Sequence, residues 1–175
     1  MFRFADGVLT PNQPPTIAVN GSPRHMAFTP DERFAYVISQ SDSMIFSFTL
    51  DKTTGRLMPL ESVASTASPT SGAHVAVHPS GKFLYASSRG DNSIVIFTID
   101  ANTGRLTRVG YQRDMISYPW WFSVDPTGQF LFVASDRSAS VLAHRVNPTT
   151  GTLQTIGMPL SVAMRPTYVG VLSLP

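Results

Sequence analysis

The sequence contains no cysteine, so disulfide bridges and thiolate metal sites are excluded. Charge is also scarce: charged residues make up 14% of the 175 residues, and the net charge is only +2. Cations do not cluster with interleaved aromatic residues, which argues against a nucleic-acid-binding surface. No apolar run approaches the length of a membrane span or of a signal-peptide core. With 42% hydrophobic residues, the composition instead favours a folded domain.

Recognisable cofactor and metal motifs are missing as well. His25, His74, His78 and His144 are scattered without the spacing of metal ligands. No glycine-rich phosphate loop and no nucleophile turn of the G-x-S-x-G type is present. We therefore expect neither a metal nor a cofactor, no nucleic-acid partner and no membrane association. A cytoplasmic location is the default expectation for such a chain.

An internal repeat dominates what is there. Segments that begin SPRHMAFTPDERFAYV, GAHVAVHPSGKFLYA and YPWWFSVDPTGQFLFV align without gaps through their first halves. Their turn prolines, Pro30, Pro79 and Pro126, are 49 and 47 residues apart. Thr-Gly pairs repeat the same intervals at Gly55, Gly104 and Gly151. This period is typical of propeller blades.

Each repeat is expected to fold as four antiparallel strands. Short inner segments (MAF, VAV, FSV) precede turns in which proline fixes φ. Second strands (FAYVI, FLYAS, FLFVA) and third strands (MIFSFTL, IVIFTID, VLAHRV) are rich in β-branched and aromatic residues. The Thr-Gly turn leads into an outer strand such as LMPLESVA. The sequence predicts an all-β fold, a β-propeller of four-stranded antiparallel blades with almost no helix; a two-sheet sandwich is the alternative.

The repeat divides the chain into five parts. Residues 1–20 are predicted to form outer strands of a partial blade, and residues 21–67, 68–116 and 117–162 three blades. Residues 163–175 match the opening of a repeat and are predicted to be an inner closing strand. Open strand edges recruit other chains. We therefore expect a homodimer in which each C-terminal strand joins the other copy's N-terminal pair and completes the ring.

Two sets of equivalent positions carry unequal residues near the expected central channel. The positions ten residues past the turn prolines hold Gln40, Arg89 and Asp136. The positions six residues before these prolines, and the next ones, hold Arg24, Ala73 and Trp120, then His25, His74 and Trp121. Scaffold positions tend to be filled alike in every repeat, so this variation indicates a grafted site. Arg24 and Arg89 would place two guanidinium groups near the channel mouth, where we expect Arg89 to be exposed. Such a pair suits a carboxylate, a phosphate or a developing oxyanion.

Four segments resemble the lactonase family of seven-bladed propellers, which includes 6-phosphogluconolactonase and the carboxymuconate-lactonizing enzyme. They are GSPRHMAF (21–28), YVISQ (36–40), HPSGKFLY (78–85) and SRGDNSI (88–94). The resemblance covers nearly the whole chain but only the C-terminal half of the family's length. It implies about half of a seven-bladed propeller.

The resemblance also implies roles for particular residues. The family's proposed site in the lactonizing enzyme uses a histidine, two arginines and a glutamate. By motif the arginines are Arg24 and Arg89, and the glutamate falls on Gln40, while the histidine belongs to an earlier blade, before residue 1. The implied catalytic set is therefore Arg24, Gln40 and Arg89. Glutamine cannot exchange a proton as a carboxylate does, which weakens an acid–base role at this position.

Each candidate also has a structural interpretation. Arg24 could form a salt bridge between blades, and His25 and His74, candidate substrate-binding residues, could be core groups that hydrogen-bond a neighbouring strand. Trp120 and Trp121 replace another arginine-containing segment of the family. They could floor a pocket for a sugar or ring, or only pack between blades.

Three functions remain open at this stage. The first is an enzyme that hydrolyses an anionic sugar lactone of the 6-phosphogluconolactone kind, or that lactonizes a carboxymuconate-like acid. Its partner would be a small anionic lactone or carboxylate, held by the two arginines, with water as nucleophile in hydrolysis. The second is a propeller that binds or scaffolds without chemistry, and the third is an inactive fragment of the enzyme.

Overall fold

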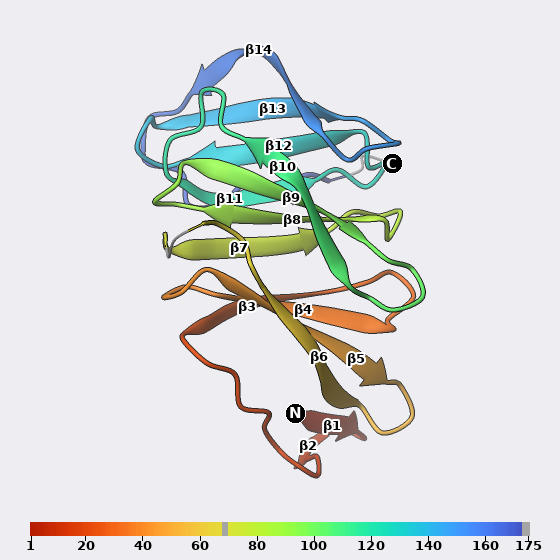
Figure 1. Ribbon diagram of the computed structural model, residues 1–175. Helices are drawn as coiled ribbons and strands as arrows, with labels where there is room; N and C mark the ends of the chain where they lie inside the picture. Colours follow the sequence, from red (N-terminus) through yellow and green to blue (C-terminus); the bar gives the residue numbers. More distant parts are fainter. Residues whose placement is uncertain (68–69, 173–175) are drawn as a thin grey trace.

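The computed structural model describes residues 1–67 and 70–172, and these residues form strands but no helix (Figure 1). Three antiparallel sheets of four strands follow one another along the chain. The first blade contains β3 (Pro23–Phe28), β4 (Phe34–Ser39), β5 (Met44–Asp51) and β6 (Arg56–Ala64). The second contains β7 (Gly72–Val77), β8 (Phe83–Ser88), β9 (Ser93–Ile99) and β10 (Leu106–Gln112). The third contains β11 (Pro119–Val124), β12 (Phe130–Ser135), β13 (Ser140–Val146) and β14 (Leu153–Ser161). The prediction of four-stranded antiparallel blades is confirmed.

The blades are meanders, because strands that are neighbours in sequence are also neighbours in each sheet. Figure 1 shows the three sheets stacked face to face, with the N-terminal hairpin at one end and the third blade at the other. The inner strands β3, β7 and β11 contact one another in succession. This arrangement is that of consecutive propeller blades around a common axis.

The second strand of a blade is buried on both faces. All six residues of β8 are buried. Leu84 packs into a cluster shared with the first blade, whereas Phe83 and Tyr85 pack into a cluster shared with the third. Successive side chains of a strand point to opposite faces, so each neighbouring blade receives alternate residues. The near-continuous apolar runs of the second strands follow from this double burial.

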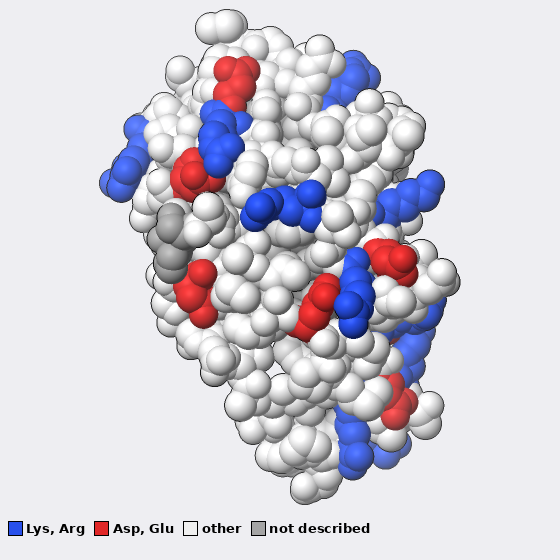
Figure 2. Space-filling model, in the orientation of Figure 1, with Lys and Arg blue, Asp and Glu red and all other residues white. Residues whose placement is uncertain are grey.

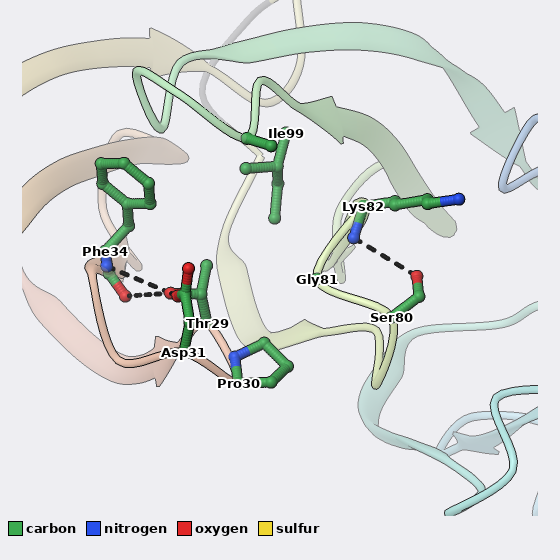
Figure 3. Close-up of a pocket in the computed structure, with 9 residues that line it drawn as sticks. Thr29, Pro30, Asp31, Phe34, Ser80, Gly81, Lys82 and Ile99 are labelled. Atoms are coloured by element: carbon green, nitrogen blue, oxygen red, sulfur yellow. Dashed lines mark hydrogen bonds between the residues drawn. The ribbon is translucent and has the colours of Figure 1, made fainter.

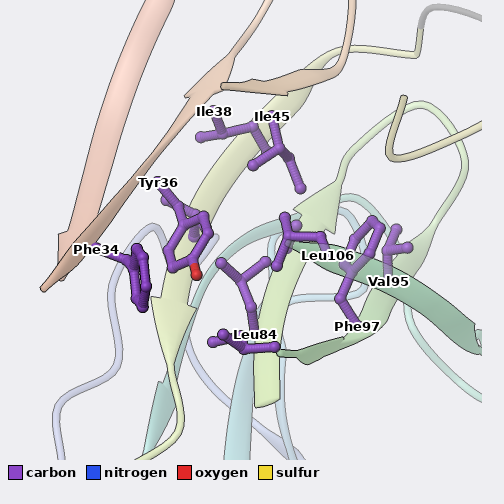
Figure 4. Packing of buried hydrophobic residues seen from close by; sticks show 11 residues of the cluster. Phe34, Tyr36, Ile38, Ile45, Leu84, Val95, Phe97 and Leu106 are labelled. Atoms are coloured by element: carbon purple, nitrogen blue, oxygen red, sulfur yellow. The ribbon is translucent and has the colours of Figure 1, made fainter. Parts of the chain in front are cut away.

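The largest core lies between the first two blades (Figure 4). Tyr36, Ile38 and Ile45 of the first blade face Leu84 and Phe97 of the second, and all five are almost completely buried. Burying one such side chain stabilises a fold by about 1.5–3 kcal/mol. The interface between blades, not the interior of a single sheet, is therefore where most of the apolar surface is removed from water.

A tyrosine hydroxyl joins each blade to the next. Tyr36 donates a hydrogen bond to the carbonyl oxygen of Gly104 at 2.9 Å, and Tyr85 does the same to Gly151 at 2.9 Å. Gly104 has a φ of +71°, and a Cβ there would lie 2.3 Å from the ring of Phe34. Gly104 and Gly151 thus need to be glycine for two reasons, a left-handed backbone and close contact with the preceding blade.

The two ends of the chain differ in how well they match the prediction. Residues 1–20 contain a hairpin of β1 (Phe2–Ala5) and β2 (Val8–Pro11). A closing strand was predicted at residues 163–175, but residues 163–172 form no strand. Residues 173–175 of the predicted strand lie outside the described residues. Residues 68 and 69, at the predicted boundary between the first two blades, lie outside them as well. The terminal segment contacts β11 through a side chain: the Ser123 hydroxyl donates to the carbonyl oxygen of Val169 at 2.6 Å. A strand needs a backbone partner, and no described residue supplies one there.

Charged side chains are scattered among uncharged ones on the face shown in Figure 2. Two of the ion pairs, Arg33–Asp31 and Lys52–Glu32, are exposed, and a third, Arg113–Asp91, is partly exposed. Exposed pairs of this kind contribute only about 0–1 kcal/mol each. Residues 1–67 and 70–172 contain no apolar helix of membrane-spanning length.

Candidate functional site

A β-bulge at the start of the inner strands aims the candidate side chains. In the β3–β4 ladder Arg24 is the residue left without a partner, and in the β11–β12 ladder it is Trp120. In the β7–β8 ladder the irregularity spans Ala73 and His74. A bulge inserts an extra residue and re-aims its side chain. The position six residues before each turn proline therefore lies at an irregularity of the strand ladder in all three blades.

Arg24 reaches across to the second blade. Its Nη1 atom donates a hydrogen bond to the carbonyl oxygen of Ala73 at 2.6 Å. Burial, together with the nearby charge of Arg89, lowers the pKa of Arg24. The suspected salt bridge between blades is absent, because Arg24 has no carboxylate partner among the residues that the structure describes. Its link between blades is a hydrogen bond to backbone.

Arg89 is buried, with 4% of its surface exposed, which contradicts the expectation of an open cation at the channel mouth. It follows β8 directly and donates from Nη2 to the hydroxyl of Ser71 at 2.8 Å. Its Nε atom is buried and has no hydrogen-bond partner among the described residues. A buried guanidinium with an unused donor is costly unless a ligand completes it.

An indole ring lies beside both guanidinium groups. The Cζ atom of Arg89 is 4.5 Å from the ring centroid of Trp120, and that of Arg24 is 5.6 Å from it. The ring of Tyr118 lies 5.6 Å from the Cζ atom of Arg89. Arg24, Arg89 and Trp120 come from three different blades, and the structure brings their side chains together. We call them, with Tyr118 and Ser71, the arginine cluster.

The predicted histidines lie next to this cluster and bond to each other. The Nδ1 atoms of His25 and His74 are 2.9 Å apart, and Nη1 of Arg24 is 3.2 Å from Nδ1 of His25. The same Nη1 atom is 3.4 Å from Nε2 of His25, so the tautomers of the two rings decide which of them donates in the His25–His74 bond. Burial first, then the charges of His25 and Arg24, lowers the pKa of His74 to about 3. Burial and Arg24 lower the pKa of His25 too, so both rings are neutral near pH 7.

Trp121 has a different environment from Trp120. Its ring stacks on His74, with centroids 3.7 Å apart and planes at 16°. It also lies 5.0 Å from the ring of Tyr168 and 5.1 Å from that of His25. His25, His74 and Trp121 contact one another, and Tyr168 of the terminal segment joins this ring cluster through Trp121. Trp121 thus packs between blades, which is one of the two roles foreseen for it.

Gln40 does not join the arginine cluster. Its side chain is exposed, and the contact that fixes it is a backbone hydrogen bond from its amide to the carbonyl oxygen of Ser22 at 2.8 Å. Asp136, at the equivalent position of the third blade, is buried and held by both Nε and Nη2 of Arg165. The only carboxylate at this set of positions is therefore already neutralised.

Two members of the arginine cluster escaped the sequence analysis. Ser71 and Tyr118 occupy the same position of successive repeats, immediately before the inner strand, and both contact Arg89. The change from serine to tyrosine at this position of the repeat could have identified it as part of the site. The described residues contain no group of three or more histidine and carboxylate side chains placed to hold a metal ion.

A cavity of about 250 Å³ lies at the other end of the strands (Figure 3). Thr29, Pro30 and Phe34 of the first blade line it together with Gly81 and Ile99 of the second. Thr29 follows the end of β3, whereas Arg24 lies at its beginning, so this cavity is separate from the arginine cluster.

The cavity arises from a substitution between repeats. In the second blade the position of Thr29 is taken by His78, whose Nε2 atom lies 2.7 Å from the carbonyl oxygen of Gly128. The imidazole fills the space between blades there, and the shorter threonine leaves it open.

Comparison with known proteins gives one family and several related structures. The family described as "Lactonase, 7-bladed beta-propeller" matches residues 1–170. A 6-phosphogluconolactonase of Bacillus subtilis is 30% identical over 64 residues, which are 37% of this chain and 18% of that protein. A Bacteroides fragilis structure provisionally named a 6-phosphogluconolactonase superposes with a TM-score of 0.85 at 31% identity, over 91% of this chain and 45% of that one. The periplasmic gluconolactonase of Pseudomonas aeruginosa gives 0.80 at 27% identity, over 91% and 46%. The chain thus spans less than half the length of these solved structures.

Proposed function

We propose that this chain, which belongs to the lactonase family of seven-bladed β-propellers, supplies the anion-binding part of a lactone-hydrolysing site. Relatives named 6-phosphogluconolactonase and gluconolactonase support a sugar lactone as the substrate class. The observation that carries the proposal is the arginine cluster. Arg89 is buried and Arg24 is half-buried beside one indole, and neither meets a carboxylate among the described residues.

Two neighbouring guanidinium groups without counterions attract an anion. Burial and the repulsion from the charge of Arg89 both lower the pKa of Arg24. A phosphate or carboxylate of the substrate would neutralise both charges and offer an acceptor to the free Nε atom of Arg89. In hydrolysis water attacks the lactone carbonyl carbon, and the ring C–O bond then breaks.

The described residues do not supply an obvious proton acceptor. His74 is hydrogen-bonded to His25 and has a pKa of about 3, so it is a weak base. Gln40 lacks a carboxylate, and Asp136 is held by Arg165. The contribution of this half of the propeller is therefore substrate binding, rather than proton transfer.

The test is hydrolysis of a lactone panel by this chain and by a version extended to the length of its relatives. The panel contains 6-phosphogluconolactone, neutral gluconolactone and a carboxymuconate-type acid for the reverse, lactonizing reaction. We expect the phosphorylated lactone to be favoured, and Arg24→Met and Arg89→Met each to raise its KM about tenfold or more. Arg33→Met, at the opposite strand ends and paired with Asp31, is the control and leaves KM unchanged. Absence of turnover of every compound by the extended protein would rule the enzyme out.

A second candidate function is anion binding without chemistry. The exposed glutamine at position 40, where the family's motif has an acid, favours it. Calorimetric binding of inorganic phosphate or gluconate by the extended protein, with no turnover of the panel, would support this alternative. The cytoplasmic location and the homodimeric ring expected from the sequence remain predictions.

A further inference from the structure

Trp120 stands in the arginine cluster at a place where the family resemblance implies an arginine-containing segment. The repeats place Arg24, Ala73 and Trp120 at one equivalent position of three blades. These three residues contact one another: Arg24 donates a hydrogen bond to the carbonyl oxygen of Ala73 and lies over the ring of Trp120. One position of the repeat thus supplies a cation, a hydrogen-bond acceptor and an aromatic ring to the same cluster.

We propose that Trp120 is a positioning residue, which holds the guanidinium groups of Arg24 and Arg89 side by side and so sets the preference of the site for anionic over neutral ligands. The inference rests on the proposed function, since it names what makes the anion-binding site selective. Its geometry is direct: the two Cζ atoms lie 5.6 Å and 4.5 Å from the centroid of one indole.

The indole offsets a repulsion that would otherwise separate the two cations. A guanidinium over an aromatic face is attracted by the negative face of the ring, and tryptophan is the strongest aromatic partner. Arg89 has one hydrogen bond from its guanidinium to a side chain, that of Ser71, and Arg24 has no ion pair among the described residues. Without the ring, each side chain gains by turning away toward water.

Trp120 and its neighbour Trp121 are distinguished by what they touch. Trp121 stacks on His74 and contacts Tyr168, so it packs the wall of inner strands. Trp120 contacts two arginines and Tyr118, whose ring centroid is 6.0 Å away. The bulge at Trp120 turns its side chain out of the alternation that β11 would otherwise impose.

The test compares Trp120→Leu and Trp120→Phe with a matched control, Tyr111→Leu. Tyr111 lies on the outer strand β10 beneath Arg108 and Arg113, at 5.3 Å and 4.2 Å, so its replacement also removes an aromatic ring from two guanidinium groups, away from the inner strands. In the extended protein we expect Trp120→Leu to weaken phosphate binding and raise KM for the phosphorylated lactone about tenfold, with kcat for neutral gluconolactone nearly unchanged. Trp120→Phe retains a ring and restores most of the affinity, and the control alters neither constant.

A second measurement reports the positions of the arginines without any ligand. In ¹⁵N NMR spectra of this chain, we expect the buried Nε–H group of Arg89 to give a sharp signal that exchanges slowly with water. Trp120→Leu is expected to broaden it or speed its exchange, whereas Tyr111→Leu leaves it as it is. An unchanged Arg89 signal in Trp120→Leu, or an equal rise in KM for charged and neutral lactones, would overturn the positioning role. Failure of the proposed function is seen separately, as lack of turnover and of phosphate binding by the unsubstituted extended protein, while the NMR comparison still decides whether the indole holds Arg89.

Discussion

The Nδ1 atoms of His25 and His74, which are 49 residues apart in the chain, lie 2.9 Å apart and join the inner strands of two blades. The bond requires one ring to donate and the other to accept, so protonating both rings breaks it. Burial holds the pKa of each below the ordinary value for histidine, and His74 titrates only at about pH 3.

The free energy of unfolding is therefore predicted to fall as the pH is lowered below about 6.5. In this range His74 binds a proton in the unfolded chain but stays neutral in the folded one. His74 alone makes the free energy of unfolding about 2–3 kcal/mol smaller at about pH 4.5 than at pH 7. His144, with a pKa of about 4, acts in the same direction. Urea unfolding at both pH values measures the loss.

The matched variant for this prediction is His74→Gln, which keeps a polar side chain but does not titrate. Its stability should depend less steeply on pH between about 6.5 and 4.5. Aspartates with lowered pKa values, such as Asp31 and Asp125, titrate mainly below this interval because their unfolded values are near 3.8. An identical slope in variant and parent would show that His74 is not the group responsible.

Arg89→Met is predicted to separate stability from function. Arg89 is buried, and its Nε atom has no hydrogen-bond partner among the described residues. Methionine of similar length removes this uncompensated charge and is expected to raise the free energy of unfolding by about 1 kcal/mol. The same variant no longer gains stability from added phosphate, whereas the parent protein does. Thermal unfolding with and without phosphate measures both effects.

Arg113→Met is the control for that substitution. Arg113 is exposed and paired with Asp91, so the change should alter stability by less than about 1 kcal/mol and leave the phosphate effect intact. A large loss of stability in Arg89→Met would mean that its contacts with Trp120 and Ser71 outweigh the cost of burying it.

The strands were predictable because their signals are local. Turn prolines, Thr-Gly pairs and β-branched runs lie within each repeat, and β4, β8 and β12 form where FAYVI, FLYAS and FLFVA indicate. The sequence predicted that Arg24 and Trp120 belong to one site, but not that the guanidinium group lies against the indole ring. The geometry of this contact depends on bulges, which belong to the register between strands and not to the sequence of one strand.

The errors have equally physical causes. Arg89 was expected to be exposed, but Tyr118 and Trp120 of the next blade cover it. The residues near position 89 in the sequence give no sign of these distant contacts. The predicted strand at 163–175 resembles the inner strands in sequence, yet residues 163–172 form none. A pattern predicts that a segment is able to pair, and the partner strand decides whether it does.

Gln40→Glu tests whether a carboxylate at that position takes part in catalysis. The side chain of Gln40 is exposed, so the substitution should leave stability within about 0.5 kcal/mol of the parent. If the extended protein hydrolyses lactones with help from an acid at this position, turnover rises by about tenfold or more. Ser41→Glu adds the same charge one residue away and serves as control. Equal rates in both variants would show that the charge, and not its place, matters.

Tyr36→Phe and Tyr85→Phe are each predicted to lower the free energy of unfolding by about 1 kcal/mol, or somewhat more, because a buried carbonyl oxygen loses its donor. The two hydroxyls serve different pairs of blades, so the effects should add in the double variant. Phe132, the equivalent residue of the third blade, has no hydroxyl and provides an internal comparison: Phe132→Tyr gains no such bond among the described residues. Equilibrium unfolding in urea checks all four proteins.

The bulge that leaves Arg24 and Trp120 outside their ladders has a consequence for how such a protein can change. A residue paired in a ladder is constrained by its neighbours, so a new side chain there disturbs the strand. A residue outside the ladder is nearly free of that constraint, and arginine, alanine and tryptophan all occupy it in three copies of one repeat. Each blade can therefore vary its contribution to the channel wall independently while the scaffold stays the same, which lets one architecture serve different ligands through a few exchangeable positions.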